Sequence, residues 1–184
     1  MIELVLLCHH ATPTAVRGVR ARLQPRRDGG LTLAYEIDAT AADLQIPAIE
    51  MPQRRAELWR HTCFELFAAG SGTSYREMNF SPSSSWAVYD FSDCRSGMQP
   101  AAVTAVPEIM RHPTRLEFTV TLDASLLQGA RTGQGVLAVS AVIEERDSRL
   151  SYWAVHHPSS TPDFHHRDGF VVSRPLISDC HERA

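Results

Sequence analysis

The feature that most constrains the fold is an alternation of apolar and polar residues with a period of two, which recurs in short runs. Residues 31–38 read LTLAYEID, and residues 116–122 read LEFTVTL. Each run puts its apolar side chains on one face of a β-strand and its polar side chains on the other. Residues 135–143 read GVLAVSAVI and are apolar on both faces, which is typical of a central strand covered on both sides. The sequence therefore predicts a β-sheet protein.

Similar runs extend this pattern over most of the chain. A long loop is expected over residues 40–57, and at most two turns of helix are expected after Asp123. About ten short strands separated by turn signals predict an all-β fold, a two-sheet antiparallel β-sandwich with little helix. The further expected strands are residues 1–8, residues 58–68, 75–80 and 85–91 as a meander, and residues 150–157 after a turn.

The size and charge of the chain limit its organisation and its partners. A length of 184 residues, of which 43% are hydrophobic, is enough for one core. We therefore expect a single domain over residues 1–184, with a frayed tail from about residue 177. The formal net charge is −3, so neither nucleic acid nor a membrane surface is predicted as a partner.

Cysteine usage and the opening residues indicate the compartment. The four cysteines are scattered with no CxxC pair, which argues against a zinc ribbon or a thioredoxin-type motif. Residues 1–8 lack the basic region of a signal peptide, and no apolar run approaches the roughly 20 residues that span a bilayer. We expect a cytoplasmic protein with reduced thiols. All 18 basic residues are arginine, so Schiff-base chemistry on a lysine is excluded.

The most chemically distinctive segment is residues 152–169, YWAVHHPSSTPDFHHRDG, which holds four of the nine histidines as two adjacent pairs. A stable fold does not require so many imidazoles and aromatic rings at a strand end and its loop. We predict that this segment contacts a ligand or that its side chains order one another. The predicted ligand contacts here are Trp153, His156, His157, Asp163, His165, His166 and Asp168.

The histidine pairs also leave a metal site open. Adjacent residues of a strand point to opposite faces, so His156 and His157 cannot both reach one ion directly. One histidine from each pair is able to converge with Asp163 or Asp168 on a divalent metal. Structural hydrogen bonds from the imidazoles are the alternative. No cofactor is therefore predicted, and haem or a divalent metal is kept as the alternative.

A second candidate patch follows from the expected meander. If its strands are neighbours, Glu65, Glu77, Asn79 and Trp86 are able to share one sheet face. Carboxylates and amides hydrogen-bond to hydroxyl groups, and an indole offers a flat apolar platform, so this set suits a sugar. An ordinary solvated sheet face is the alternative interpretation. A hydrolase that uses Glu65 and Glu77 as paired carboxyls is a further alternative.

Residues 58–91 together with residues 152–170 resemble the small bacterial DOMON-like proteins, which are similar to family 9 carbohydrate-binding modules and to haem-binding DOMON domains. The resemblance covers roughly residues 15–172 and implies a β-sandwich that binds a ligand without catalysis. The residues that carry it in the central region are His61, Glu65, Leu66, Phe67, Tyr75, Glu77, Ser81 and Pro82.

The resemblance implies two kinds of ligand. Carbohydrate-binding relatives hold a sugar between aromatic rings, for which Trp59, Trp86, Trp153 and Tyr75 are available. Haem-binding relatives use a methionine with a histidine or a lysine as axial ligands. Because lysine is absent, only a methionine–histidine pair remains, namely Met78 with one residue of the first histidine pair.

Together these patterns predict a non-catalytic module for a saccharide-like or sugar-nucleotide ligand. The alternatives are a haem or divalent-metal protein that uses the histidine pairs and a hydrolase that uses the two glutamates. The ligand contacts predicted in the central region are Trp59, Arg60, His61, Glu65, Tyr75, Glu77, Asn79 and Trp86.

Overall fold

The computed structural model describes residues 1–9, 14–70, 72–127 and 135–173, and these residues form an almost entirely β structure. The tail expected from residue 177 lies outside them. No helix in the described part is long and apolar enough to cross a membrane. The strands are β1 (Ile2–Cys8), β2 (Gly18–Pro25), β3 (Leu31–Asp38), β4 (Gln53–Arg54), β5 (Cys63–Ala69), β6 (Tyr75–Phe80), β7 (Ser85–Phe91), β8 (Gln99–Pro100), β9 (Glu108–Arg111), β10 (Glu117–Leu122), β11 (Val136–Glu144), β12 (Leu150–Ala154) and β13 (Val172–Ser173).

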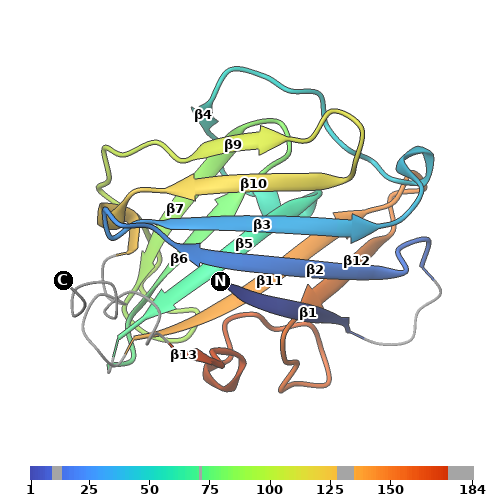
Figure 1. Cartoon of the computed structure of the whole chain (residues 1–184). Coiled ribbons are helices and arrows are strands. Elements are labelled where there is room, and N and C mark those ends of the chain that lie inside the picture. Colours follow the sequence, from blue (N-terminus) through green and yellow to red (C-terminus); the bar gives the residue numbers. More distant parts are fainter. Residues whose placement is uncertain (10–13, 71, 128–134, 174–184) are drawn as a thin grey trace.

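All of these strands belong to one hydrogen-bonded sheet in the order β4-β7-β6-β5-β11-β12-β1-β2-β3-β10-β9, with β13 on β11 and β8 on β7. The sheet curls back on itself, so that β1, β2, β3, β10 and β9 cross in front of β5, β6, β7 and β11 (Figure 1). We call the first group the front half and the second group, with β12, the back half. The described pairs are antiparallel except β4 with β7, which makes the sheet mixed.

The prediction of a β-sandwich with two separate sheets is therefore corrected to one curled, half-barrel sheet, while the all-β class and the scarcity of helix are confirmed. The join between the halves is short. Strand β1 pairs with β2 over most of its length, and only Leu7 and Cys8 continue across to Ala154 and Trp153 of β12. These two residue pairs make a single sheet out of what would otherwise be two.

The main core lies between the two halves. The alternation in residues 31–38 is confirmed, because Leu31, Leu33, Tyr35 and Ile37 are all buried. The ring of Tyr35 stacks on that of Phe64 at 4.5 Å between centroids, and Phe64 in turn lies 4.9 Å from Phe118 of β10. The Tyr35 hydroxyl donates a 2.8 Å hydrogen bond to the backbone oxygen of Glu65, which ties the front half to the back half.

The back half is covered on its outer face as well, and the candidate site lies on this face. Strands β5 and β6 are buried at every position, and β7 is buried at every position except Asp90. A second apolar cluster forms on this outer face beneath residues 155–170 and the 3-10 helix η2 (Leu58–Arg60). The expected strand over residues 58–68 therefore begins only at Cys63, because the chain first makes this 3-10 turn.

The remaining differences from the expected elements are local. The long loop at residues 40–57 contains a short 3-10 turn, η1 (Ala41–Asp43), and β4. The helical turn after Asp123 is η3 (Ala124–Leu127). The strand expected to reach residue 157 ends at Ala154, so the first histidine pair lies beyond it.

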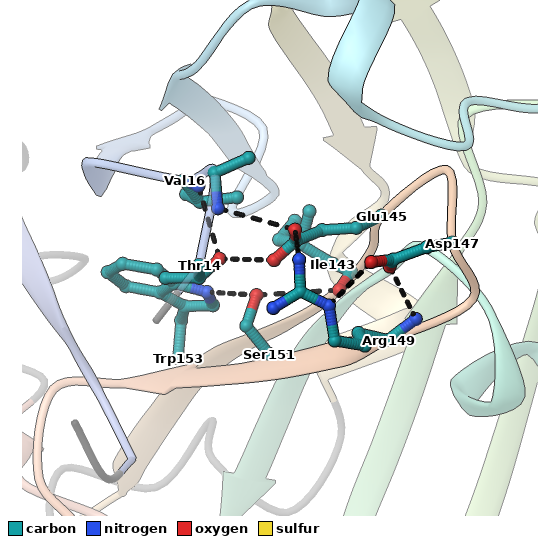
Figure 2. A network of polar contacts seen from close by, with 9 residues as sticks. Thr14, Val16, Ile143, Glu145, Asp147, Arg149, Ser151 and Trp153 are labelled. Atoms are coloured by element: carbon teal, nitrogen blue, oxygen red, sulfur yellow. Dashed lines mark hydrogen bonds and ion pairs between the residues drawn. The ribbon is translucent and has the colours of Figure 1, made fainter. Parts of the chain in front are cut away.

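A buried carboxylate, that of Glu145, links the segment before β2 to the turn between β11 and β12 (Figure 2). Glu145 is only 4% exposed. It accepts hydrogen bonds from the Thr14 hydroxyl and the Ala15 N–H, and the Arg149 guanidinium lies 3.0 Å away. In the same region the Trp153 indole donates to the Ser151 hydroxyl at 2.9 Å.

We expect Thr14→Val to lower the free energy of unfolding by about 2 kcal/mol, since a hydrogen bond to a charged group contributes roughly 1.5–3 kcal/mol. Denaturant unfolding of the two proteins measures the difference. Thr121→Val is the matched control, because this half-buried strand threonine makes no side-chain hydrogen bond within the described residues. Equal midpoints for Thr14→Val and the wild type would show that Glu145 is satisfied without Thr14.

Candidate functional site

A cavity of about 310 Å³ lies on the outer face of the back half, and both polar and aromatic side chains line it. Its floor comes from β5, β6, β7, β11 and β12, and its walls come from η2, the loop after β7 and residues 162–165. The lining residues are Trp59, Glu65, Glu77, Phe91, Arg95, Met98, Val142, Tyr152, Pro162, Phe164 and His165. Trp59, Glu65, Glu77 and His165 were predicted as ligand contacts from the sequence.

Strand register decides which side chains reach this face. Glu65 of β5 pairs with Asn79 of β6, and Tyr75 pairs with Phe91 of β7, so these side chains share the outer face with Glu77. Trp86, expected on the same face, pairs instead with Phe80 and is buried in the main core. The expectation for Trp86 is therefore corrected, because the turn between β6 and β7 sets a register with the opposite parity.

The Glu65 carboxyl is 3% exposed, and its Oε2 atom accepts a 3.2 Å hydrogen bond from the Ser140 hydroxyl. Burial raises the pKa of Glu65 well above its ordinary value, and the nearby charge of Glu77 raises it further. Both effects favour the protonated, neutral form of this carboxyl. Its Oε1 atom has no hydrogen-bond partner within the described residues.

The Glu77 carboxyl is equally enclosed, at 4% exposure. Its Oε1 atom accepts a 2.7 Å hydrogen bond from the Asn79 amide. Burial raises the pKa of Glu77 to about 7, although the Asn79 hydrogen bond and the charge of Arg95 oppose the shift. The charge of Glu77 consequently changes near neutral pH.

His165 is held in one orientation by aromatic rings. Its imidazole packs edge-on against Phe67 at 5.3 Å and Phe91 at 5.2 Å between centroids. Its Nδ1 atom lies 2.7 Å from the Tyr75 hydroxyl, which itself accepts a hydrogen bond from the backbone N–H of Arg95. We therefore assign the Tyr75 proton to the bond with Nδ1, which leaves the imidazole proton on Nε2.

The charge state of this histidine follows from the same burial. Desolvation lowers the pKa of His165 to about 4, and the positive charge of Arg95 adds to the effect, so the imidazole is neutral. Its Nε2 atom lies 3.8 Å from the Glu77 Oε2 atom, which is longer than a hydrogen bond. Burial also raises the pKa of Tyr75 to about 12, which keeps its phenol protonated.

The rim of the cavity carries an ion pair. The Arg95 guanidinium lies 2.8 Å from the Asp163 carboxylate, which also accepts the backbone N–H of His165 at 3.0 Å. Burial alone would raise the pKa of Asp163, but the hydrogen bond from Arg95 lowers it below its ordinary value. The cationic group nearest the cavity is thus already engaged.

Several predicted contacts lie elsewhere. Trp153, like Trp86, is buried in the main core between the sheet halves. Arg60 and His61 line a second cavity of about 400 Å³ and bond to Glu57 at 3.0 Å and to Glu144 at 2.8 Å, respectively. Tyr75, Asn79 and Asp163 do not line the first cavity but hold residues that do.

The histidine pairs do not gather in one place. His156 is exposed, and the His157 imidazole bonds to the backbone oxygen of Leu7 at 2.8 Å. The His166 imidazole accepts the backbone N–H of the exposed Asp168 at the start of η4 (Arg167–Gly169). Among the described residues, no three histidine, cysteine or acidic side chains form a group that could hold a metal ion. Met78, the candidate haem ligand, is fully buried in the main core.

Seven of the eleven residues that line the cavity were not predicted as contacts from the sequence. Phe91, Val142 and Tyr152 follow from strand parity once the register of β7, β11 and β12 is known. Arg95 lies in a turn with a left-handed backbone, φ 51°, and no local pattern marks it as a site residue. Met98 and Pro162 likewise reach the cavity only through the path of their loops.

Comparison with known proteins supports the fold. No protein-family model matches the sequence, and no curated protein is similar to it. The structure is similar to a crystal structure of a putative carbohydrate-binding protein from Bacteroides uniformis, with a TM-score of 0.66 and 12% sequence identity over 92% of this chain and 84% of that chain. At this identity the likeness shows a shared fold. The resemblance to DOMON domains and family 9 modules stays a prediction.

Proposed function

We propose that this chain is a non-catalytic binding module that takes a small saccharide-like ligand in the cavity over Glu65 and Glu77. The observation that carries the proposal is the placement of two enclosed carboxyl groups beside the rings of Trp59, Tyr152 and Phe164. The neighbour from Bacteroides uniformis, which is described as a putative carbohydrate-binding protein, supports it.

The proposed recognition uses both sides of a sugar ring. Aromatic rings pack against its apolar C–H faces, while carboxyl oxygens accept hydrogen bonds from its hydroxyl groups. Glu65 and Glu77 each have one oxygen with no hydrogen-bond partner among the described residues. A cavity of about 310 Å³ is at the lower end of the roughly 300–1,000 Å³ of ligand pockets, so a ligand of one or two sugar units is expected.

We expect Trp59→Ala to weaken binding at least tenfold, because a ring that packs on the ligand contributes more than about 1.4 kcal/mol. Calorimetry with a panel of mono- and disaccharides first identifies a saccharide that the wild type binds and then compares the variant. Met110→Ala is the control, since Met110 is exposed on β9 of the front half. Unchanged affinity in Trp59→Ala would remove this wall of the cavity from the binding site.

The same titrations test the hydrolase alternative. Glycosidases need two carboxyl groups, one of which has a raised pKa and acts as the acid. Glu77 has that property, with a pKa of about 7, and Glu65 lies beside it in the cavity lining. Recovery of the saccharide intact after titration is expected from a binding module, whereas cleaved product would reassign both glutamates to catalysis.

A further inference from the structure

Among the described residues, the enclosed part of the cavity contains two acidic side chains and no cationic one. Glu65 and Glu77 are each at least nine-tenths buried and present an oxygen that no described residue satisfies. The charges around them do not compensate. Arg95, at the rim, is 57% exposed and is paired with Asp163, while His165 is a neutral imidazole. The described part of the site therefore lacks a positive partner of its own. An unpaired carboxylate in such surroundings costs free energy.

The remaining walls suit a cation. Trp59, Phe91, Tyr152 and Phe164 surround the carboxyl groups with aromatic rings. The face of an aromatic ring carries negative potential and attracts an ammonium group within about 6 Å, most strongly where water is excluded. Carboxylates and aromatic faces together favour a small positively charged group over a neutral hydroxyl.

We propose that the saccharide bound in this cavity carries a protonated amino group. This inference rests on the proposed saccharide-binding function and specifies its substrate class. The ammonium group donates to the Glu77 Oε2 atom and to the Glu65 Oε1 atom, with aromatic rings against its remaining sides. A neutral hydroxyl in the same place donates one hydrogen bond and leaves any charge on Glu77 uncompensated.

Binding of such a ligand is coupled to proton release. The titratable and charged groups that face Glu77 are Glu65 from β5, Tyr75 from β6, Tyr89 from β7, Cys63 from β5, Arg95 from the loop after β7, and His165. Glu77, with a pKa of about 7, changes charge near neutral pH. A bound ammonium favours its ionised form, so the complex forms with loss of a proton to the buffer.

The test is calorimetry at neutral pH with glucosamine, glucose and N-acetylglucosamine, which share one ring and differ in the amino group. We expect glucosamine to bind at least tenfold more tightly than either neutral sugar. We also expect its binding heat to change between two buffers that differ in ionisation enthalpy. In Glu77→Gln the preference should fall to within twofold, whereas Glu36→Gln, at an exposed acid of the front half, should keep it.

The outcomes separate the two proposals. Equal affinity for all three sugars would overturn the amino-sugar inference and leave the saccharide-binding function standing. A preference for glucosamine that survives in Glu77→Gln would overturn the assigned contact. Binding of none of the three would count against both proposals, and a folded far-ultraviolet spectrum of each variant shows that the comparison is valid.

Discussion

Replacing Phe64 by alanine should lower the free energy of unfolding by about 4 kcal/mol, within the roughly 3–5 kcal/mol typical of a buried Phe→Ala change. Phe64 is fully buried at the centre of the main core. Its ring contacts Tyr35 of β3 and Phe118 of β10, so it joins the back half to the front half. Alanine leaves a cavity that these rings cannot fill. Denaturant unfolding with a fitted slope measures the loss.

The control distinguishes this position from the aromatic residues of the site. Phe164 is only half-buried, at the wall of the candidate cavity. Phe164→Ala should therefore cost much less stability than Phe64→Ala, because water can occupy the vacated space. Similar losses for the two variants would contradict the view that the core between the halves holds the sheet in its curled form.

The stability of the wild type relative to that of Glu77→Gln should fall as pH rises from about 4.5 to about 7. The native pKa of Glu77 is about 7 and its ordinary value is 4.5, so between these values the native state keeps a proton that the unfolded state has lost. The stabilisation that protonated Glu77 contributes is complete below pH 4.5 and is lost as pH rises through the native pKa of about 7. At about 1.4 kcal/mol per unit, the loss is roughly 3 kcal/mol.

Glu77→Gln should therefore match the wild type in acid and exceed it in stability above pH 7 by up to about 3 kcal/mol. Denaturant unfolding at a series of pH values gives both curves. Glu36→Gln serves as the exposed control and should run parallel to the wild type. Parallel curves for Glu77→Gln and the wild type would mean that Glu77 is not held in a desolvated site.

His165 acts in the opposite direction on the same curve. Its pKa is lowered from 6.5 to about 4, so between these pH values the imidazole is protonated in the unfolded state but neutral in the native state. The stability contributed by neutral His165 is complete above the ordinary value and is lost as pH falls toward about 4. Between about pH 4.5 and 6.5 the contributions of Glu77 and His165 therefore oppose each other. Burial raises the pKa of Glu65 as well, so Glu65 acts in the same direction as Glu77.

Local pattern predicted the strands of this protein but not how the sheet closes. The alternation at residues 31–38 places its apolar residues in the core as expected, because a half-buried strand leaves that signature in the sequence. The curl depends on Leu7 and Cys8 pairing with Ala154 and Trp153, nearly the full length of the chain away. No periodicity within either strand records such a pairing.

In the candidate site, too, the features that are local in sequence were predicted and those that depend on tertiary structure were not. Glu77 and Asn79 were placed on one face because parity within β6 is a local property, and the register of β5 with β6 puts Glu65 on that face as expected. Trp86 was misplaced because its parity relative to β6 depends on the register across a turn. Arg95 could not be found at all, since it reaches the cavity through the path of a loop that only the tertiary structure defines.

The strand order has a consequence for how the chain folds as it leaves the ribosome. Strand β1 is made first, yet one of its neighbours, β12, begins at Leu150, and β5 must likewise wait for β11. Pairings between segments so distant in sequence form slowly and leave sheet edges exposed until they do. Residues 162–165, which wall the candidate cavity, follow β12 and emerge later still. The candidate cavity is thus completed only after β12 has been made.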